Sequence, residues 1–210
     1  MASGIISTVI AKGNVAWAIV FTIIINIVGI FVIPFTFGHS IQLNAGNGIN
    51  SLQILQNLLM LVLLPAIIGY LIKKKYGDSK HFIFTYFQPT AIIFIAFCTV
   101  GAGKEDFTKL NFSSLSLLLF MVILLHMLLF TFCIIFSKTK KLSGDETIAL
   151  TFVCSQKTLP LALALLITLP KEIASIASIS CLLYHLSQVF IDSFIAYFWQ
   201  KKQSATSTVN

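Results

Sequence analysis

Residues 147–169 read TIALTFVCSQKTLPLALALLITL, an apolar run of membrane length that carries Ser-Gln-Lys-Thr at its centre and Pro160 shortly after. A lysine at bilayer depth costs about 2.5–3.5 kcal/mol on insertion scales, so it is a site hypothesis by default. Proline removes a backbone donor and clashes with the preceding turn. We therefore predict a helix broken at mid-membrane with polar groups at the break, as in the sites of many secondary carriers.

The composition places the whole chain in a membrane. Hydrophobic residues make up 57% of it, charged residues 10%, and the mean hydropathy is +0.94, whereas ordinary soluble domains carry about 25% charge. We expect an all-α polytopic membrane domain over residues 1–202 and a disordered polar tail over 203–210. The four cysteines lie in apolar runs without paired spacing, which predicts small buried hydrophobes rather than a disulfide frame or a zinc site.

The apolar runs predict the number of membrane spans. A spanning helix needs about 20 apolar residues, and residues 2–12 are too short a run to form a complete span. Six longer runs qualify, at 15–37, 52–72, 82–102, 112–136, 147–169 and 174–199.

The lysines predict the orientation of the chain. The net charge is +7, and the lysines concentrate in alternate short loops, which is the positive-inside pattern. This places both termini in the cytoplasm and favours an inner (cell) membrane of bacterial type. Because the interleaved aromatic residues belong to lipid-length segments, the basic charge does not indicate a nucleic-acid partner.

A second polar group lies on the last predicted span. His185, Gln188 and Asp192 are spaced three and four apart, which places them on one helical face next to Tyr184. A carboxylate inside a lipid-length span needs a partner. Lys157 is the one lysine expected at depth, so a Lys157–Asp192 pair is a natural hypothesis. The alternative is that Asp192 lies near the cytoplasmic end and is hydrated there.

The candidate binding residues combine these two groups. Amide and hydroxyl oxygens suit a small cation, and Lys157 supplies a positive charge that either holds an anionic group or replaces a bound sodium ion. The alternative for Lys157 is a lysine that snorkels to an interface, and His126 is interpreted as a packed core histidine. No catalytic motif is present, so we do not expect an enzyme. The candidates are Ser155, Gln156, Lys157, Thr158, His185 and Gln188.

Three segments resemble the bile acid/sodium symporter superfamily, most closely its bile acid cotransporter 7-like (SBF-like) branch. Phe152-Val-Cys-Ser-Gln-Lys-Thr158 resembles the motif F-C-G-S-x-K-S of that branch. Tyr184-His185-x-x-Gln188 resembles its Y-H-x-x-Q motif. The segment from Ser3-Gly4 to Ala11-Lys12-Gly13-Asn14 resembles the S-G…A-x-G-N segment that ends the first broken helix. The similarity covers nearly the whole chain.

The resemblance implies ten helices in two inverted repeats of five, each with one broken helix, and the two breaks cross near the membrane centre. This chain corresponds to the latter part, with one complete broken helix, so we expect an N-terminal truncation that removes half of the crossing. Sodium-coupled members carry a glutamate shortly before the break, followed by M-Q-N-S. Aligned on Gln156, the glutamate position is Phe152 and the asparagine is Lys157, so no cofactor is expected and sodium coupling is disfavoured.

The sequence therefore predicts a secondary transporter that moves a small organic solute, an anion, by alternating access. Several alternatives stay open. The chain is a non-transporting truncated remnant, one half of a split transporter whose second chain supplies the missing helices, or a homo-oligomer that shares a site. A structural membrane subunit is a further class. The expected partners are the lipid bilayer, the solute and such a second chain.

Overall fold

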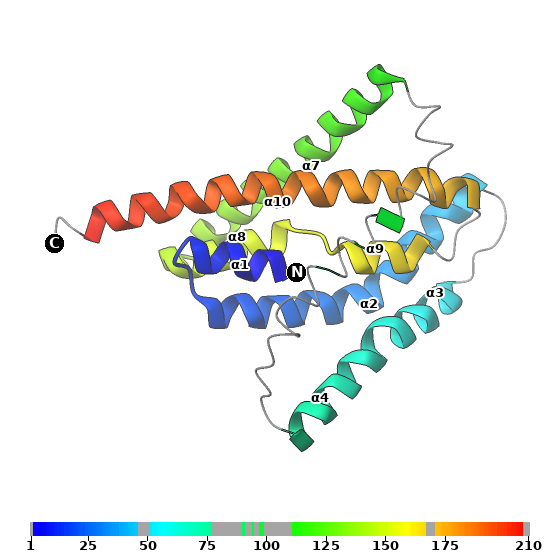
Figure 1. Cartoon of the computed structure of the whole chain (residues 1–210), viewed down its shortest axis with the longest axis horizontal. Helices are drawn as coiled ribbons and strands as arrows, with labels where there is room; N and C mark the ends of the chain where they lie inside the picture. Colours follow the sequence, from blue (N-terminus) through cyan, green and yellow to red (C-terminus); the bar gives the residue numbers. More distant parts are fainter. Residues whose placement is uncertain are drawn as a thin grey trace. The chain divides into compact units, whose positions relative to one another are not determined.

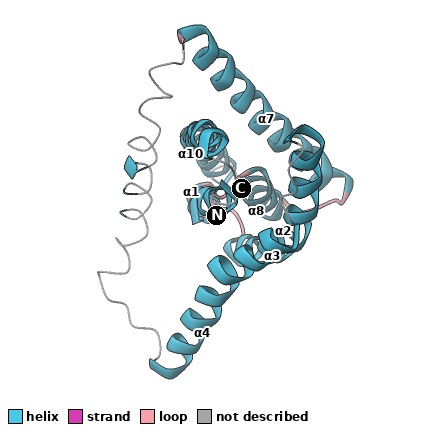
Figure 2. Cartoon of the chain, turned by 90° about the vertical axis from the view of Figure 1, so that its right-hand side faces the viewer, coloured by secondary structure: helices cyan, strands magenta, loops and turns pink. Residues whose placement is uncertain are grey.

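The computed structural model describes residues 2–45, 51–76, 111–166 and 171–207, with four single positions at 90, 94, 97 and 98. Within these residues every regular element is a helix (Figures 1 and 2). The elements are α1 (Ala2–Ile10), α2 (Val15–Ala45), α3 (Ser51–Leu58), the π-helical η1 (Leu59–Leu63), α4 (Leu64–Tyr76), α7 (Phe112–Thr139), α8 (Gly144–Ser155), α9 (Leu159–Leu166) and α10 (Lys171–Ser207).

The predicted spans correspond to helices wherever the structure describes them. Three described helices are long and apolar enough to cross a membrane, at Val15–Thr36, Phe112–Thr139 and Ala177–Ser204. The predicted span 52–72 is filled by α3, η1 and α4, which follow one another without a gap. The predicted span 82–102 lies outside the described residues except for the four single positions. The total of six spans therefore stays a prediction.

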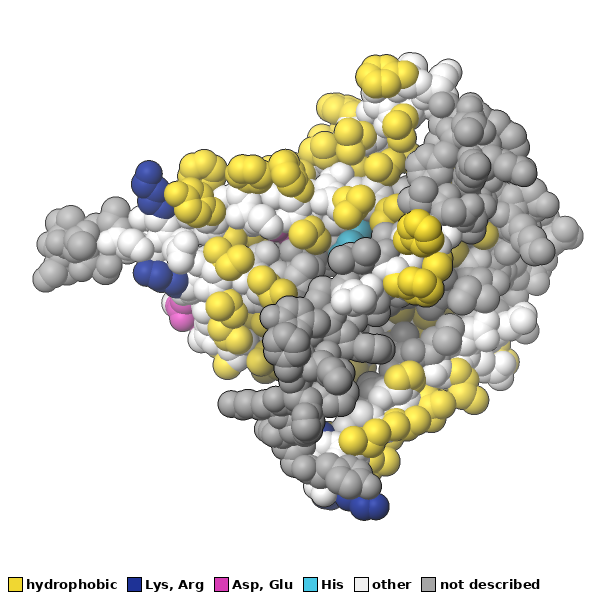
Figure 3. All heavy atoms as spheres, viewed as in Figure 1, with side chains coloured by type: hydrophobic (Ala, Val, Ile, Leu, Met, Phe, Trp, Pro, Cys, Tyr) yellow, Lys and Arg dark blue, Asp and Glu magenta, His cyan; other side chains and the backbone are white. Residues whose placement is uncertain are grey.

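Large apolar side chains cover the outer faces of the long helices. On α10 the exposed ones include Leu186, Phe190, Phe194, Tyr197 and Phe198, each between 52% and 66% exposed. Figure 3 shows hydrophobic side chains spread over α10 and α7, with lysines toward the C-terminal end of α10. Apolar surface on this scale would drive aggregation in water. Lipid is its natural solvent, and the protein is an integral membrane protein.

The chain divides into two compact units. The first consists of Met1–Val28, Phe112–Leu159 and Leu183–Asn210, and the second of Gly29–Asn111 and Pro160–Leu182. In the second unit a buried apolar cluster joins α2, α3 and α9 through Ile30, Ile54, Leu58 and Leu165. The predicted break and its polar partners on α1, α7 and α10 lie in the first unit.

The short helix α1 packs closely against α8 through a face of small residues. Gly4, Ser7, Thr8 and Ala11 recur at positions three and four apart, and all four are buried. A Cβ atom added at Gly4 would lie 3.1 Å from the carbonyl oxygen of Phe152. Small residues let two membrane helices approach closely, which is how helices associate where lipid removes the hydrophobic driving force.

The turn between α1 and α2 is fixed by backbone hydrogen bonds. Gly13 N–H donates to Thr8 C=O at 2.8 Å, and Lys12 occupies the left-handed region with φ 56°, as in a Schellman motif that ends a helix. Asn14 then begins α2, because its Oδ1 accepts a hydrogen bond from Trp17 N at 3.2 Å. Asn14, a weak polar signal in the sequence, is therefore a helix cap.

Replacing Gly13 with alanine is expected to destabilise this turn by about 1–3 kcal/mol, the usual cost of overpacking. The new Cβ would lie 2.5 Å from Ile148 Cγ2 and 2.9 Å from Thr8 Cγ2, and both neighbours are stiff β-branched side chains. Thermal unfolding of the detergent-solubilised protein measures the effect. Gly144→Ala is the matched control, because nothing lies within 4 Å of its Cβ position. Equal melting temperatures for the two variants would contradict the close approach.

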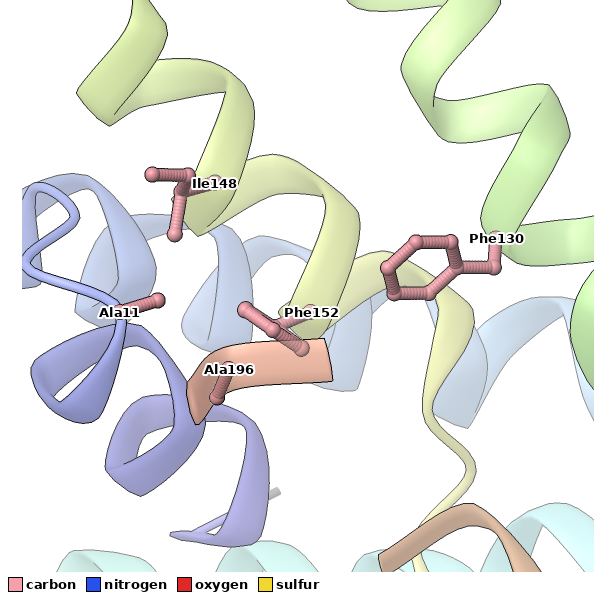
Figure 4. Packing of buried hydrophobic residues seen from close by; sticks show 5 residues of the cluster. All are labelled: Ala11, Phe130, Ile148, Phe152 and Ala196. Carbon is pink, nitrogen blue, oxygen red and sulfur yellow. The ribbon is translucent and has the colours of Figure 1, made fainter. Parts of the chain in front are cut away.

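An aromatic cluster holds α7, α8 and α10 together. Figure 4 shows Phe130 of α7 directed toward Phe152 of α8, with Ala11, Ile148 and Ala196 on the other side of Phe152. The Phe130 and Phe152 ring centroids lie 5.8 Å apart at 71°, and the Phe152 and Trp199 centroids lie 5.3 Å apart at 87°. These are favourable edge-to-face arrangements. Phe152, 0% exposed, is thus an apolar core residue.

The start of α8 is a capping box. Ser143 Oγ accepts a hydrogen bond from Glu146 N at 3.4 Å, and Ser143 N donates to Glu146 Oε2 at 3.0 Å. Ser143 Oγ also donates to Asp145 Oδ1 at 2.6 Å, which lowers the pKa of that carboxyl. The resulting stabilisation is present above the ordinary pKa of an aspartate and is lost as the pH falls through the lowered value.

The C-terminal end differs from the expected disordered tail. Helix α10 continues to Ser207, and residues 208–210 lie outside the described residues. Lys12 Nζ donates to Ser204 Oγ at 3.0 Å, so residues 203–207 contain a contact to the α1–α2 turn. A polar composition alone does not prevent helix formation when a long apolar helix precedes it and supplies the nucleus.

Candidate functional site

The predicted break is present between α8 and α9. Helix α8 ends at Ser155, residues 156–158 are not helical, and α9 begins at Leu159. Gln156 has the extended backbone angles φ −79° and ψ 145°. The cause lies in the sequence: Pro160 has no N–H to donate to the carbonyl of residue 156, and its ring would clash with that carbonyl. Proline is tolerated in the first turn of α9, where its missing donor costs nothing.

Gln188 of α10 satisfies the backbone that the break leaves free. Its Oε1 accepts a hydrogen bond from Lys157 N at 2.9 Å, and its Nε2 donates to Lys157 O at 2.7 Å. A glutamine amide carries a donor and an acceptor in the same arrangement as a peptide group. Backbone groups at membrane depth must find partners inside the protein. Gln188, 0% exposed, therefore replaces the missing helical hydrogen bonds.

Gln156 connects three helices through its side chain. Its Oε1 accepts a hydrogen bond from Ser3 Oγ of α1 at 2.6 Å. Its Nε2 donates to Asp192 Oδ2 of α10. The residue is 2% exposed, so both polar ends of the buried amide are paired, as burial of a polar group requires.

Asp192 pairs with His126, which corrects both sequence hypotheses for this carboxylate. His126 Nε2 and Asp192 Oδ1 lie 3.0 Å apart, and the two side chains are 1% and 0% exposed. The carboxylate is therefore not hydrated. Its two oxygens contact His126 and Gln156, and Lys157 is not their partner. The prediction that His126 is a buried histidine is confirmed, although it is also one half of a polar pair.

The remaining candidate residues from the sequence differ in burial and in hydrogen bonding. Ser155 is 0% exposed, and its Oγ has no hydrogen-bond partner among the described residues. The side chain of Lys157 is exposed, and Thr158 is half-buried. His185, 8% exposed, accepts a hydrogen bond at Nδ1 from Gln188 Nε2 at 3.0 Å. The structure thus brings Gln156, His185 and Gln188 together around the backbone of Lys157, whose side chain is exposed.

Three residues of this network are not among the binding residues predicted from the sequence: Ser3, His126 and Asp192. Ser3 had a signal, since it stands in a motif quoted for the resemblance, but residues 2–12 are predicted only to be too short for a complete span. A lone histidine in a Leu- and Met-rich run, such as His126, is compatible with simple packing. Its partner lies 66 positions away in the sequence, and only the packing of α7 against α10 brings the two together.

Comparison with known proteins identifies the lineage. The model of the SBF-like CPA transporter family matches residues 1–201. The chain belongs to this family. Family membership confirms the resemblance to the bile acid/sodium symporter superfamily, and the family consists of transporters rather than enzymes.

Curated relatives from plants and amphibians are about a quarter identical to the chain over the aligned residues. A protein named probable sodium/metabolite cotransporter BASS4, chloroplastic, of Arabidopsis thaliana is 26% identical over 99% of the chain and 51% of its own length. The protein of the same name in Oryza sativa subsp. japonica is 23% identical over 96% of the chain and 52% of its own length. Sodium/bile acid cotransporter 7-A of Xenopus laevis is 26% identical over 93% of the chain and 59% of its own length. The chain spans about half the length of the curated relatives it matches.

Proposed function

We propose that this protein forms the substrate-binding part of a secondary transporter for a small organic anion. The observation that carries the proposal is the break at Gln156–Thr158, where side chains from α1 and α10 pair with a non-helical segment. Irregular backbone at membrane depth is tolerated where it is buried in protein or lines a cavity. Broken helices of this kind form the binding sites of many secondary carriers.

The finer features of the proposal extend beyond the family assignment. We propose six spans that correspond to the latter part of a ten-helix inverted-repeat transporter, with both termini in the cytoplasm of a bacterial cell and the protein in its inner membrane. The alternating lysine loops support this orientation. In this proposal Gln156, Lys157 and Thr158 line the solute site and Ser155 supports them. His185 and Gln188 face the same core.

Uptake by the purified chain in proteoliposomes tests the proposal. A radiolabelled bile acid and a radiolabelled monocarboxylate serve as probes, because both are small organic anions. Accumulation above that of protein-free vesicles supports the proposal. Accumulation only after co-reconstitution with a second chain that supplies the remaining family helices supports one half of a split carrier. The absence of uptake in both arrangements contradicts transport and favours a remnant.

Sodium is not the coupling ion in this proposal. Phe152 stands where the resemblance places a sodium-binding glutamate, and it is enclosed by Phe130 and Trp199 with 0% exposure. A cation needs oxygen ligands, and an aromatic cluster offers none. Lys157 adds a positive charge to the break, which repels a second cation.

Replacing external sodium with potassium is therefore expected to leave the initial rate of uptake unchanged. The comparison uses equal chloride concentrations and vesicles clamped at zero membrane potential, so that only the cation differs. Initial rates are measured at several sodium concentrations. A steep rise of the rate with sodium would overturn this part of the proposal.

Replacing Lys157 with alanine is expected to reduce uptake of an anion about tenfold while membrane abundance stays constant, since losing one charged contact costs roughly 1.5–3 kcal/mol. The Lys157 side chain is exposed, and Gln188 bonds only to its backbone, which the substitution keeps. Uptake is normalised to protein measured by immunoblot. Lys201→Ala, an exposed lysine far along α10, is the control. Equal losses of abundance and uptake would instead indicate a folding role for Lys157.

A further inference from the structure

We propose that the His126–Asp192 pair is a proton-binding site, which takes up one proton at His126 Nδ1 and releases it during the transport cycle. The release of the proton during a transport cycle rests on the proposed transport function, whereas the binding of the proton to the pair does not depend on it. The class of coupling ion would then be the proton.

The hydrogen bonds define the state from which the proton is taken up. Gln156 Nε2 can only donate, and it donates to Asp192 Oδ2; His126 Nε2 lies 3.0 Å from Asp192 Oδ1. We take as the starting state the one in which His126 Nε2 also donates, so that both Asp192 oxygens accept hydrogen bonds and the carboxylate is ionised. In that state the neutral His126 ring carries its proton on Nε2.

The other ring nitrogen is the place for the arriving proton. His126 Nδ1 is buried and has no hydrogen-bond partner among the described residues. In the neutral ring with Nε2–H, Nδ1 is an unused acceptor. Buried polar atoms without partners are uncommon and need an explanation. An acceptor that is filled in only one state of the cycle explains it.

Binding of a proton changes the net charge of the His126–Asp192 pair. With a neutral imidazole the pair carries one negative charge inside lipid-length helices, which is costly when no cation compensates it. A proton from hydronium forms the Nδ1–H bond, leaves water behind and gives an imidazolium–carboxylate pair with zero net charge. The reverse transfer to water restores the negative charge. Gln156 bonds Asp192 directly and Ser3 on its other side, so each transfer changes the charge that acts on the break.

The titratable groups around the pair are compatible with this role. On α10 these are Tyr184 and His185, on α7 Cys133, on α8 Cys154, and in the break Lys157, while α1 has no titratable side chain. The Tyr184 ring lies edge-on to His126 with 6.2 Å between centroids, and its hydroxyl is buried without a partner among the described residues. The hydrogen-bond partners of Asp192 among the described residues are His126 and Gln156, and none of these titratable groups is one of them.

Nitrogen NMR of the full chain in lipid nanodiscs tests the proton site without any solute. The protein is labelled with ¹⁵N-histidine, and its four histidines are few enough for assignment by His126→Gln. We expect the His126 signals to change from the Nε2–H neutral form to imidazolium as the pH is lowered. In Asp192→Asn the imidazolium signal is expected to be lost or strongly reduced at the same pH, because its counter-ion is gone. His185→Gln is the control and should leave the His126 signals in place.

Two results would overturn the inference. His126 that stays neutral over the whole pH range in which the protein is folded has no accessible proton site. An imidazolium signal that is the same in Asp192→Asn shows that the pair does not act as a unit. A titrating His126 together with absent uptake in proteoliposomes would remove the proposed transport function but keep the proton site, so the two failures are distinguishable.

Discussion

Replacing Asp192 with leucine is expected to lower the free energy of unfolding by about 3–5 kcal/mol, the usual cost of removing one partner of a buried charged pair. The substitution takes away the acceptor of His126 Nε2 and of Gln156 Nε2 at once. Both donors stay buried, since His126 is 1% exposed and Gln156 is 2% exposed. Neither can turn to water without moving α7 or the end of α8.

The double variant His126→Leu/Asp192→Leu separates the pair from simple loss of packing. Replacing both members of a buried pair with apolar residues is often neutral or stabilising, so the double variant should be more stable than Asp192→Leu alone. Thermal unfolding in detergent, with denaturant titration where it is reversible, gives the stabilities. Ser193→Leu is the matched control, because this neighbour on α10 is exposed. A double variant with the summed losses of the single ones would show that the pair does not interact.

The local part of this site was predictable from the sequence, because local chemistry determines it. Pro160 and the polar residues before it predict a break near residue 156, and the structure begins the break at Gln156, four residues before the proline. The spacing of His185 and Gln188 predicts that they share one face of the helix, and in the structure their side chains are hydrogen-bonded to each other on α10. These features need only helix periodicity and the missing donor of proline.

The pairing between helices could not be predicted in the same way. Asp192 had two plausible sequence interpretations, and the structure supports neither, because the buried carboxylate pairs with His126 of α7 at 3.0 Å. The closeness of Ser3 to Gln156 likewise depends on the small-residue face of α1, which lets the backbone of Gly4 approach α8. Such contacts depend on how whole helices pack, and the sequence shows only the residues that permit them.

Replacing Gln188 with methionine is the second substitution with a large expected effect. Methionine is similar in length and flexible, so the packing is kept while the amide is removed. Lys157 N and Lys157 O then lose the partners that they have at 2.9 Å and 2.7 Å. A backbone group that loses its partner costs up to about 1–3 kcal/mol where it is buried, and these two groups are partly buried in a segment whose backbone depends on protein partners.

Hydrogen exchange distinguishes this local cause from general destabilisation. In Gln188→Met the peptides that cover the break should exchange faster, while those that cover α7 should change little, because α7 has no hydrogen bond to Gln188 among the described residues. Gln200→Met, a half-buried glutamine on the same helix, controls for the substitution itself. Uniformly faster exchange in all helices would show that Gln188 supports the fold as a whole. Faster exchange confined to the break would show that one side-chain amide keeps the helix open at mid-membrane, which any solute or proton site there requires.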